Sequence, residues 1–246
     1  MSEIRYHRPS NFPPVVKNLL IINVLVFVAQ LALENSYQLT ARFMLYPFLP
    51  QSQLLNEFIH YRFGNSYYGF HPFQLITHMF SHSPGSFLHI IFNMLMLWMF
   101  GRVLENVWGP KRFLIFYLAC GLGAAALHLG VQYFRAEQLV QALEAGNVPA
   151  ALKLEGALGP ALGASGAVMG IMAAFAYLFP NTELMIIPIP VPIKAKWMVL
   201  GYVLIDLFLG VGNTGDNVAH FAHLGGAITG FIIVFIWNKT NRRTLY

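Results

Sequence analysis

A serine and a histidine in two separate apolar segments are the residues of this 246-residue chain best suited to chemistry. Ser165 lies in Gly163-Ala164-Ser165-Gly166, and His223 lies in Ala222-His223-Leu224-Gly225-Gly226. A serine hydroxyl becomes a good nucleophile when a base removes its proton, and neutral histidine is the usual base near pH 7. The pair predicts nucleophilic catalysis if the fold brings both side chains together at one depth.

Small residues around this pair predict that the two segments pack closely, because they let helix backbones approach each other. They are Gly163, Gly166 and Gly170 beside the serine, and Gly226 and Gly230 after the histidine. Either Ser165 or His223 alone has a structural explanation, since serine often bonds a carbonyl of its own helix and histidine often links helices. Their joint pattern favours a catalytic pair.

A third polar element consists of His89 and Asn93, which are four residues apart and therefore share one helix face. Two such donors facing a serine could stabilise the oxyanion that forms when it attacks a carbonyl. His78 and His82 are also four apart and raise the alternative of a metal site. No carboxylate or thiolate is placed to join them, so we expect neither a metal nor a cofactor.

The composition sets the environment of these residues, because 57% of the chain is hydrophobic and only 10% is charged. Such a chain is too apolar for a soluble domain and indicates a polytopic membrane protein. Spans of about 20 apolar residues must be helical in lipid, and the sequence lacks the alternation of a β-barrel. We predict an all-α bundle of six spans at residues 15–33, 75–100, 112–133, 162–179, 197–211 and 218–237.

The basic residues orient this bundle, because cytoplasmic loops carry an excess of Lys and Arg. Eleven of the 15 fall on one side of the six spans. These are Arg5, Arg8, Lys17, Arg102, Lys111, Arg112, Lys194, Lys196, Lys239, Arg242 and Arg243. We therefore expect cytoplasmic segments at 1–14 and 238–246 and an active site that opens to the other side. The net charge of +5 is then a topology signal, and nucleic-acid binding is not expected.

Two long non-cytoplasmic segments complete a single domain covering residues 1–246. Residues 34–74 are rich in aromatic residues, and we expect short helices around Phe43 or Leu54, or otherwise a structured loop. Residues 134–161 form an insertion that begins with an amphipathic helix at 135–145, which Gly146 ends. A second short helix is expected from Pro149 to Glu155.

Taken together, these motifs resemble the rhomboid intramembrane serine proteases. The resemblance combines the serine motif at 163–166, the histidine motif at 222–226, His89-x-x-x-Asn93 with Thr77-His78 upstream, and Gly101-Arg102-Val103-Leu104-Glu105 followed by Gly109. It extends over nearly the whole chain, from about Pro13 to Trp237. The combination is specific, whereas each motif alone would be weak.

The resemblance implies a role for each matching residue: Ser165 as nucleophile, His223 as general base, and His89 with Asn93 as oxyanion stabilisers. Supporting roles are assigned to His78, His82, Gly163, Gly166, His220 and Gly226. The family uses a dyad without a third carboxylate. Accordingly, we expect neither Asp206 nor Asp216 to orient His223, since no motif positions them.

The resemblance also implies membrane-protein substrates, whose transmembrane helix would approach between spans two and five and be cut there. Residues 212–217 have the glycine and Asx content of a mobile cap over the site. Many bacterial members carry Trp-Arg in the first loop, where this chain has Tyr61-Arg62. A short six-span form favours a bacterial plasma membrane. The sequence leaves the oligomeric state open.

Two other functions remain as alternatives to proteolysis. A catalytically inactive relative that binds membrane helices would keep the fold and usually lose the serine or the histidine, but this chain keeps both. A channel or transporter could use the histidines as a proton relay. It would be expected to show broken helices in paired halves, and the sequence has no internal symmetry.

Overall fold

Six apolar helices, a set of short peripheral helices and one β-hairpin make up the computed structural model, which describes residues 9–186, 189–212 and 220–240. The apolar helices are α1 (Pro14–Tyr37), α5 to α6 (Phe87–Trp108, with a π turn at Leu97–Gly101), α7 (Pro110–Glu144), α9 (Ser165–Leu178), α10 (Ala195–Gly212) and α11 (His220–Thr240). Four of these are long and apolar enough to cross a membrane within the described residues: α1, Phe87–Trp108, α7 and α11. The protein is therefore a helical, multi-pass membrane protein.

The second span differs from the prediction at both ends. Residues 75–80 belong to α4 (Gln74–Thr77) and to a 3-10 turn, η2 (His78–Phe80), and the continuous helix begins only at Phe87. Pro84 and Gly85 lie in the intervening turn, where proline and glycine favour a break. The helix continues past Phe100 to Trp108 and ends at Gly109, whose φ of 80° is the left-handed conformation that glycine adopts readily.

Span three and the amphipathic helix at 135–145, which were predicted as two separate elements, form one helix, because α7 runs without interruption to Glu144. No glycine or proline lies between Gly130 and Gly146, so nothing in this stretch interrupts the helix. The predicted stop is observed, with Gly146 at φ 65°. The second short helix is also observed, as α8 (Val148–Leu154), which is followed by a 3-10 turn, η4 (Glu155–Leu158).

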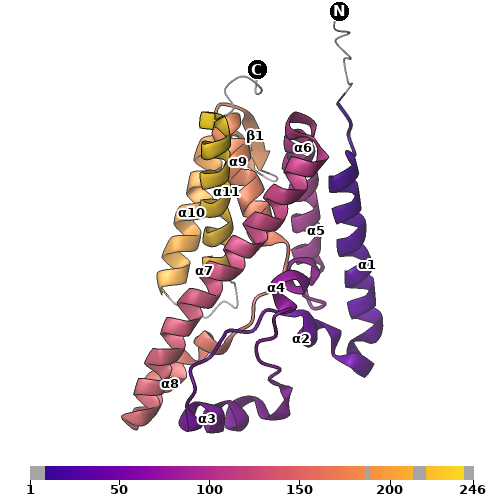
Figure 1. Ribbon diagram of the computed structural model, residues 1–246. Coiled ribbons are helices and arrows are strands. Elements are labelled where there is room, and N and C mark those ends of the chain that lie inside the picture. Colours follow the sequence, from indigo (N-terminus) through magenta and orange to yellow (C-terminus); the bar gives the residue numbers. More distant parts are fainter. Residues whose placement is uncertain (1–8, 187–188, 213–219, 241–246) are drawn as a thin grey trace, which may run out of the picture.

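The first long loop contains the predicted short helices, α2 (Leu39–Phe43) and α3 (Gln53–Phe63), before a 3-10 turn, η1 (Gly64–Ser66). The α3 helix lies beside α8 and the far end of α7, at the opposite end of the bundle from the start of α1 and the end of α11 (Figure 1). Leu55 and Ile59 of α3 pack there against Leu139 and Val140 of α7. An ion pair between Arg62 of α3 and Glu155 of η4, 2.8 Å apart, also joins α3 to the segment that follows α8.

A β-hairpin between α9 and α10 was not expected from the sequence. Strands β1 (Glu183–Ile186) and β2 (Ile189–Lys194) pair antiparallel, with Glu183 opposite Lys194 and Leu184 opposite Ile193. Strand β2 carries Pro190 and Pro192, which are poor strand formers because proline lacks an N–H donor. A ribbon of two strands tolerates them, since each strand has one open edge.

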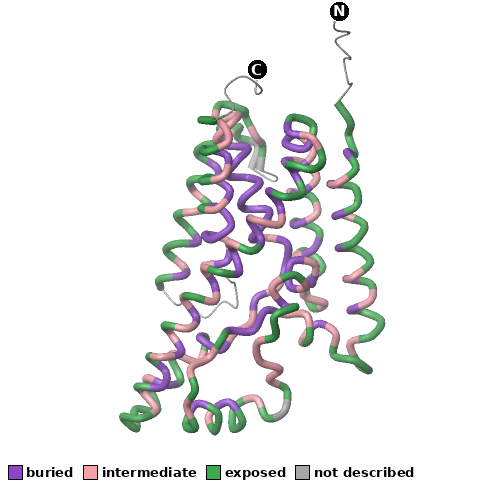
Figure 2. Tube along the Cα trace, viewed as in Figure 1, coloured by how far each residue is buried: buried purple, intermediate pink, exposed green. Residues whose placement is uncertain are grey.

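The α9 helix forms the centre of the bundle and is buried throughout residues 166–176. It contacts α5, α7, α10 and α11, and Figure 2 shows burial concentrated on α9 and on the surfaces facing it. The outer surfaces of α1 and α10 instead expose leucine, isoleucine, valine and phenylalanine, as expected for helices in lipid. The fold thus places Ser165, the first residue of α9, inside the bundle.

Close backbone contact holds α9 against α11, as the glycine pattern predicted. A Cβ atom added to Gly226 would lie only 1.8 Å from the carbonyl oxygen of Gly166. One added to Gly230 would lie 2.5 Å from the carbonyl oxygen of Gly170. These positions accept only glycine without separating the helices. The same contact sets the distance between the side chains at the start of α9 and of α11.

Candidate active site

Ser165 and His223 lie within hydrogen-bonding distance, with 2.8 Å between the serine Oγ and the imidazole Nε2. Ser165 is the first residue of α9, and His223 lies in the first turn of α11. Both side chains are partly exposed, although the residues on either side of Ser165 are buried. A hydroxyl that bonds a histidine nitrogen and remains accessible has the geometry of an activated nucleophile.

The turn before α9 aims Ser165 and requires glycine. Gly163 has φ 118°, a conformation that other residues rarely adopt, and its N–H donates to the His78 carbonyl at 2.8 Å. A Cβ at this position would lie 2.8 Å from His89 Nε2 and 3.6 Å from Ser165 Oγ. The predicted supporting role of Gly163 therefore has a steric basis, because the turn passes directly against the His89 ring.

The structure places His89 and Asn93 on α5, with the His89 ring against this turn and Asn93 one helical turn further along. The Ser83 N–H points at His89 Nδ1 from 3.5 Å, which makes Nδ1 the acceptor and leaves the hydrogen of the neutral ring on Nε2, the atom nearest Gly163. Asn93 Nδ2 donates to the His89 carbonyl at 2.8 Å, which leaves a second amide hydrogen for a ligand. Both residues can therefore donate hydrogen bonds.

Two buried histidines, His78 and His82, lie beneath the same turn. His78 Nδ1 donates to the Gln74 carbonyl at 2.7 Å, and the Ala164 N–H points at His82 Nε2 from 3.5 Å. Burial lowers the pKa of each imidazole to about 4, so both rings are neutral near pH 7. They support the turn as uncharged hydrogen-bonding groups.

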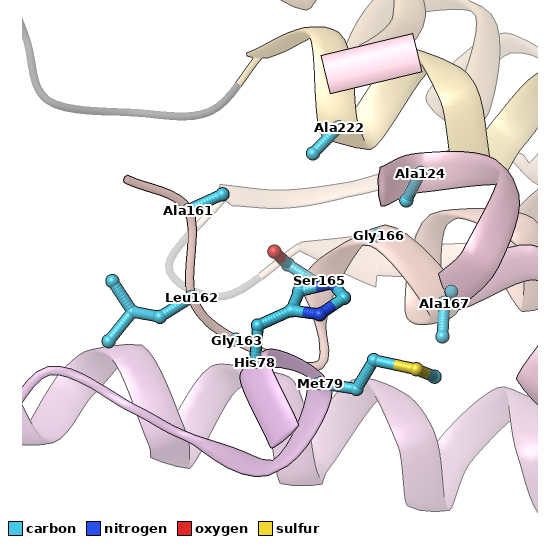
Figure 3. A pocket seen from close by; sticks show the side chains of 11 residues that line it. His78, Met79, Ala124, Ala161, Leu162, Gly163, Ser165, Gly166, Ala167 and Ala222 are labelled. Carbon is cyan, nitrogen blue, oxygen red and sulfur yellow. The ribbon is translucent and has the colours of Figure 1, made fainter. Parts of the chain in front are cut away.

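A small pocket reaches Ser165 from the side of η2 and α7 (Figure 3). Its lining combines His78 and Met79 from η2, Gly163 and Ser165 from the turn into α9, and Ala222 from α11. Alanine, glycine and one leucine make up the rest of the lining. The serine hydroxyl is therefore next to a narrow space with apolar walls and one imidazole.

Asp206 corrects the expectation that no carboxylate orients His223. Both of its oxygens lie 3.2 Å from His223 Nδ1, and Oδ1 lies 2.7 Å from Nδ1 of His220. The signal was present in the sequence, since Asp206 is the one acidic residue of the predicted fifth span. An ionisable residue inside a membrane span is a functional candidate for that reason alone.

The same three side chains form a group that could hold a cation, since one ligand atom from each of Asp206, His220 and His223 lies within 4.8 Å of the others. Two imidazoles and a carboxylate are suitable ligands for zinc. A cation there would occupy His223 Nδ1 and displace the hydrogen bond to the carboxylate. The sequence did not indicate this grouping.

Some sequence predictions concern residues outside the described part of the chain. The predicted cap at 212–217 is described only at Gly212. Asp216 also lies outside, as do four of the basic residues used for orientation, namely Arg5, Arg8, Arg242 and Arg243.

Comparison with known proteins gives the family of this chain. The family model described as the Rhomboid domain matches residues 70–240, which is more than half of the chain. The chain belongs to the rhomboid family.

Three relatives illustrate the breadth of this similarity. The chain is 29% identical over 159 residues to Rhomboid protein 1, mitochondrial, of Saccharomyces cerevisiae, covering 65% of this chain and 40% of that protein. It is 30% identical over 182 residues to human Presenilin-associated rhomboid-like protein, mitochondrial, which covers 69% of this chain and 37% of that protein. It is 30% identical over 145 residues to Rhomboid protease GluP of Bacillus subtilis, which covers 58% of this chain and 22% of that protein. The aligned region thus spans well under half of each relative.

Proposed function

We propose that this protein is an intramembrane serine endopeptidase that uses Ser165 as nucleophile and His223 as general base. The observation that carries the proposal is the 2.8 Å contact between Ser165 Oγ and His223 Nε2 within a membrane-embedded bundle. A pocket next to the hydroxyl and a named rhomboid protease among the relatives support it. No cofactor is needed for this chemistry.

Acylation would begin when His223 Nε2 takes the Ser165 proton as Oγ attacks a peptide carbonyl. The oxyanion would form near the start of α9, where the first backbone N–H groups of a helix lack partners in the helix and favour negative charge. His89 Nε2 and the second amide hydrogen of Asn93 would add side-chain donors. The tetrahedral intermediate would therefore be stabilised by α5 and α9 together.

Collapse of this intermediate would release the amine fragment, which takes the proton from His223, and would leave an ester on Ser165. Water would then attack the ester, with His223 accepting its proton and returning it to the serine oxygen. Neutral His78 beside the pocket could hold this water by hydrogen bonding. The cycle ends with the free carboxyl fragment and the original serine.

Substrates of the proposed enzyme are membrane proteins, and we place their approach between α5 and α10. The outward surface of α5 exposes Phe87, Leu88 and Ile91, and that of α10 exposes Ile205 and Phe208. Large exposed apolar side chains suit contact with lipid or with another transmembrane helix. The flanking residues 34–74 and 134–161 would lie at the end of the bundle where the site opens.

The proposed orientation puts the start of α1 and the end of α11, which lie at the same end of the bundle, on the cytoplasmic side (Figure 1). Segments 1–14 and 238–246 would then be cytoplasmic parts of one domain. We propose a bacterial plasma membrane as the location, and fractionation of the source cells tests it. The names of two relatives place those proteins in mitochondria, which makes an organellar membrane the competing location. Recovery of this protein in an organellar membrane would contradict the proposed location.

Cleavage by purified protein in liposomes tests the proposal. Wild-type protein should cut a single-span substrate and react with a fluorophosphonate at Ser165, and either Ser165→Ala or His223→Ala should abolish cleavage, because each removes one partner of the proton transfer. Ser66→Ala and His60→Ala, which change exposed residues of the first loop, serve as matched controls. Undiminished proteolysis by the Ser165→Ala variant would refute the proposal.

A further inference from the structure

A buried carboxylate lies behind the proposed catalytic base. Asp206 lies in α10 and is 5% exposed, although ionised side chains are rarely buried without partners. Within the described residues its partners are two imidazoles of α11, with His220 Nδ1 at 2.7 Å and His223 Nδ1 at 3.2 Å from both carboxylate oxygens. One side chain of α10 thus contacts two histidines in the first turn of α11.

The contacts fix where the protons must be. An ionised carboxylate only accepts hydrogen bonds, so the Nδ1 atom of His223 must carry the hydrogen that points at Asp206. In a neutral imidazole the other nitrogen then has a free lone pair, and this is Nε2, the atom 2.8 Å from Ser165 Oγ. The carboxylate therefore selects the one tautomer of His223 that can accept the serine proton.

His220 completes the arrangement from the same helix as His223. Its Nδ1–H donates to Oδ1 of Asp206 at 2.7 Å and so helps to hold the carboxylate in place. A contact that served only to join α10 to α11 would need a single pair, such as Asp206 with His220. A purely structural role would not explain why both oxygens of Asp206 also lie close to His223 Nδ1.

We propose that Asp206 is a positioning residue for the peptidase reaction, so that Ser165, His223 and Asp206 act as a triad in which His220 holds the carboxylate. This inference rests on the proposed function. Asp206 would keep His223 in the productive tautomer and stabilise the imidazolium formed after proton transfer, without touching the substrate itself. The expected dyad is thereby extended by one residue.

Isosteric replacement tests this role. We expect Asp206→Asn to lower kcat by about 10²-fold to 10⁴-fold with KM within about twofold, because an amide can donate to Nδ1 and stabilise the wrong tautomer. Asp206→Glu should restore part of the rate, and His220→Ala should lower kcat less than Asp206→Asn. Glu57→Gln, which changes an exposed carboxylate of α3, is the matched control.

The pH profile adds a readout that a structural role would not change. The titratable and charged groups facing His223 are Asp206 from α10, His220 from α11 and His89 from α5, and Ser165 faces it from α9. Loss of the negative charge in Asp206→Asn should make His223 harder to protonate. The acid limb of the kcat/KM profile should therefore move to lower pH, while that of Glu57→Gln stays in place.

Nitrogen-15 NMR of histidine-labelled wild-type protein gives a second measurement that needs no variant of Asp206. His223, assigned by comparison with His223→Ala, should show a hydrogen on Nδ1 and none on Nε2 at neutral pH. The opposite tautomer would overturn the positioning role, even if Asp206→Asn failed to fold.

The outcomes separate the two proposals. Ser165-dependent cleavage that Asp206→Asn leaves unchanged in kcat and pH profile would overturn the positioning role alone. Absence of Ser165-dependent cleavage and labelling in wild-type protein would overturn both proposals. Wild-type cleavage that a chelator abolishes and zinc restores would assign the three side chains to a metal and would also overturn the positioning role.

Discussion

At the scale of single residues, most of the chemistry could be predicted and one part could not. Ser165, His223, His89 and Asn93 stand in recognisable motifs, and the structure joins Ser165 to His223, sets His89 against the turn before Ser165 and places Asn93 one helical turn after His89. Asp206 stands out in the sequence only as the one acidic residue of the predicted fifth span, and its contact with His223 depends on how α10 packs against α11. Spacing along one helix can be read from sequence, whereas the facing residue of another helix cannot.

Asn93 provides a graded test of the oxyanion site. Asn93→Ala should lower kcat about tenfold to a hundredfold, since it removes one donor of several, and KM should change little. Steady-state cleavage of the same substrate measures both constants, and Asn56→Ala on exposed α3 is a matched control. An unchanged kcat would remove Asn93 from the proposed oxyanion site.

At the scale of elements, hydropathy predicted where the apolar helices lie in the sequence, but it did not predict the residues at which they begin and end. Span three was expected to end at Tyr133, whereas α7 continues to Glu144 because its extension packs against α3 and keeps a buried surface. The second span began later than predicted, since residues 75–80, which are apolar except for Thr77 and His78, belong to the short helices α4 and η2 rather than to a spanning helix. Apolar composition alone does not distinguish residues that face lipid from those that face protein.

The first turn of α1 is capped by a residue that is distant in the sequence. Pro13 offers no side-chain cap, and the N–H groups of Val15 and Val16 instead donate to the Glu105 carboxylate of α6 at 2.9 and 2.7 Å. Glu105 is 2% exposed. The family segment noted around Gly101 and Glu105 therefore joins the first helix to the rest of the bundle.

Replacement of this carboxylate should destabilise the protein more than it affects the site. Glu105→Gln should lower the free energy of unfolding by about 1.5–3 kcal/mol, because it weakens two hydrogen bonds to a charged group. Denaturant titration in mild detergent measures the change, with Glu57→Gln on α3 as the exposed control. A Glu105→Gln variant as stable as wild type would show that α1 does not need this cap.

At the scale of the whole molecule, the contact between α9 and α11 is the feature on which the site depends. Gly226→Ala should destabilise the bundle by about 1–3 kcal/mol or more and reduce cleavage, since the new methyl group meets the backbone of Gly166. Gly201→Ala on α10 is the matched control, because a Cβ there meets nothing within 4 Å. Thermal unfolding and cleavage rate report the two effects. Equal stability of both variants would contradict the close contact.

The absence of side chains between Gly166 and Gly226 has a consequence for how the protein should respond to its surroundings. Side chains in an ordinary helix interface can change rotamer and absorb a small displacement, but two touching backbones cannot. Any force that separates α9 from α11, such as altered lateral pressure in the bilayer, should therefore lengthen the distance between Ser165 Oγ and His223 Nε2, over which the proton travels. Inactivation on heating should accordingly precede the loss of helical structure, and lipid composition should tune the turnover rate.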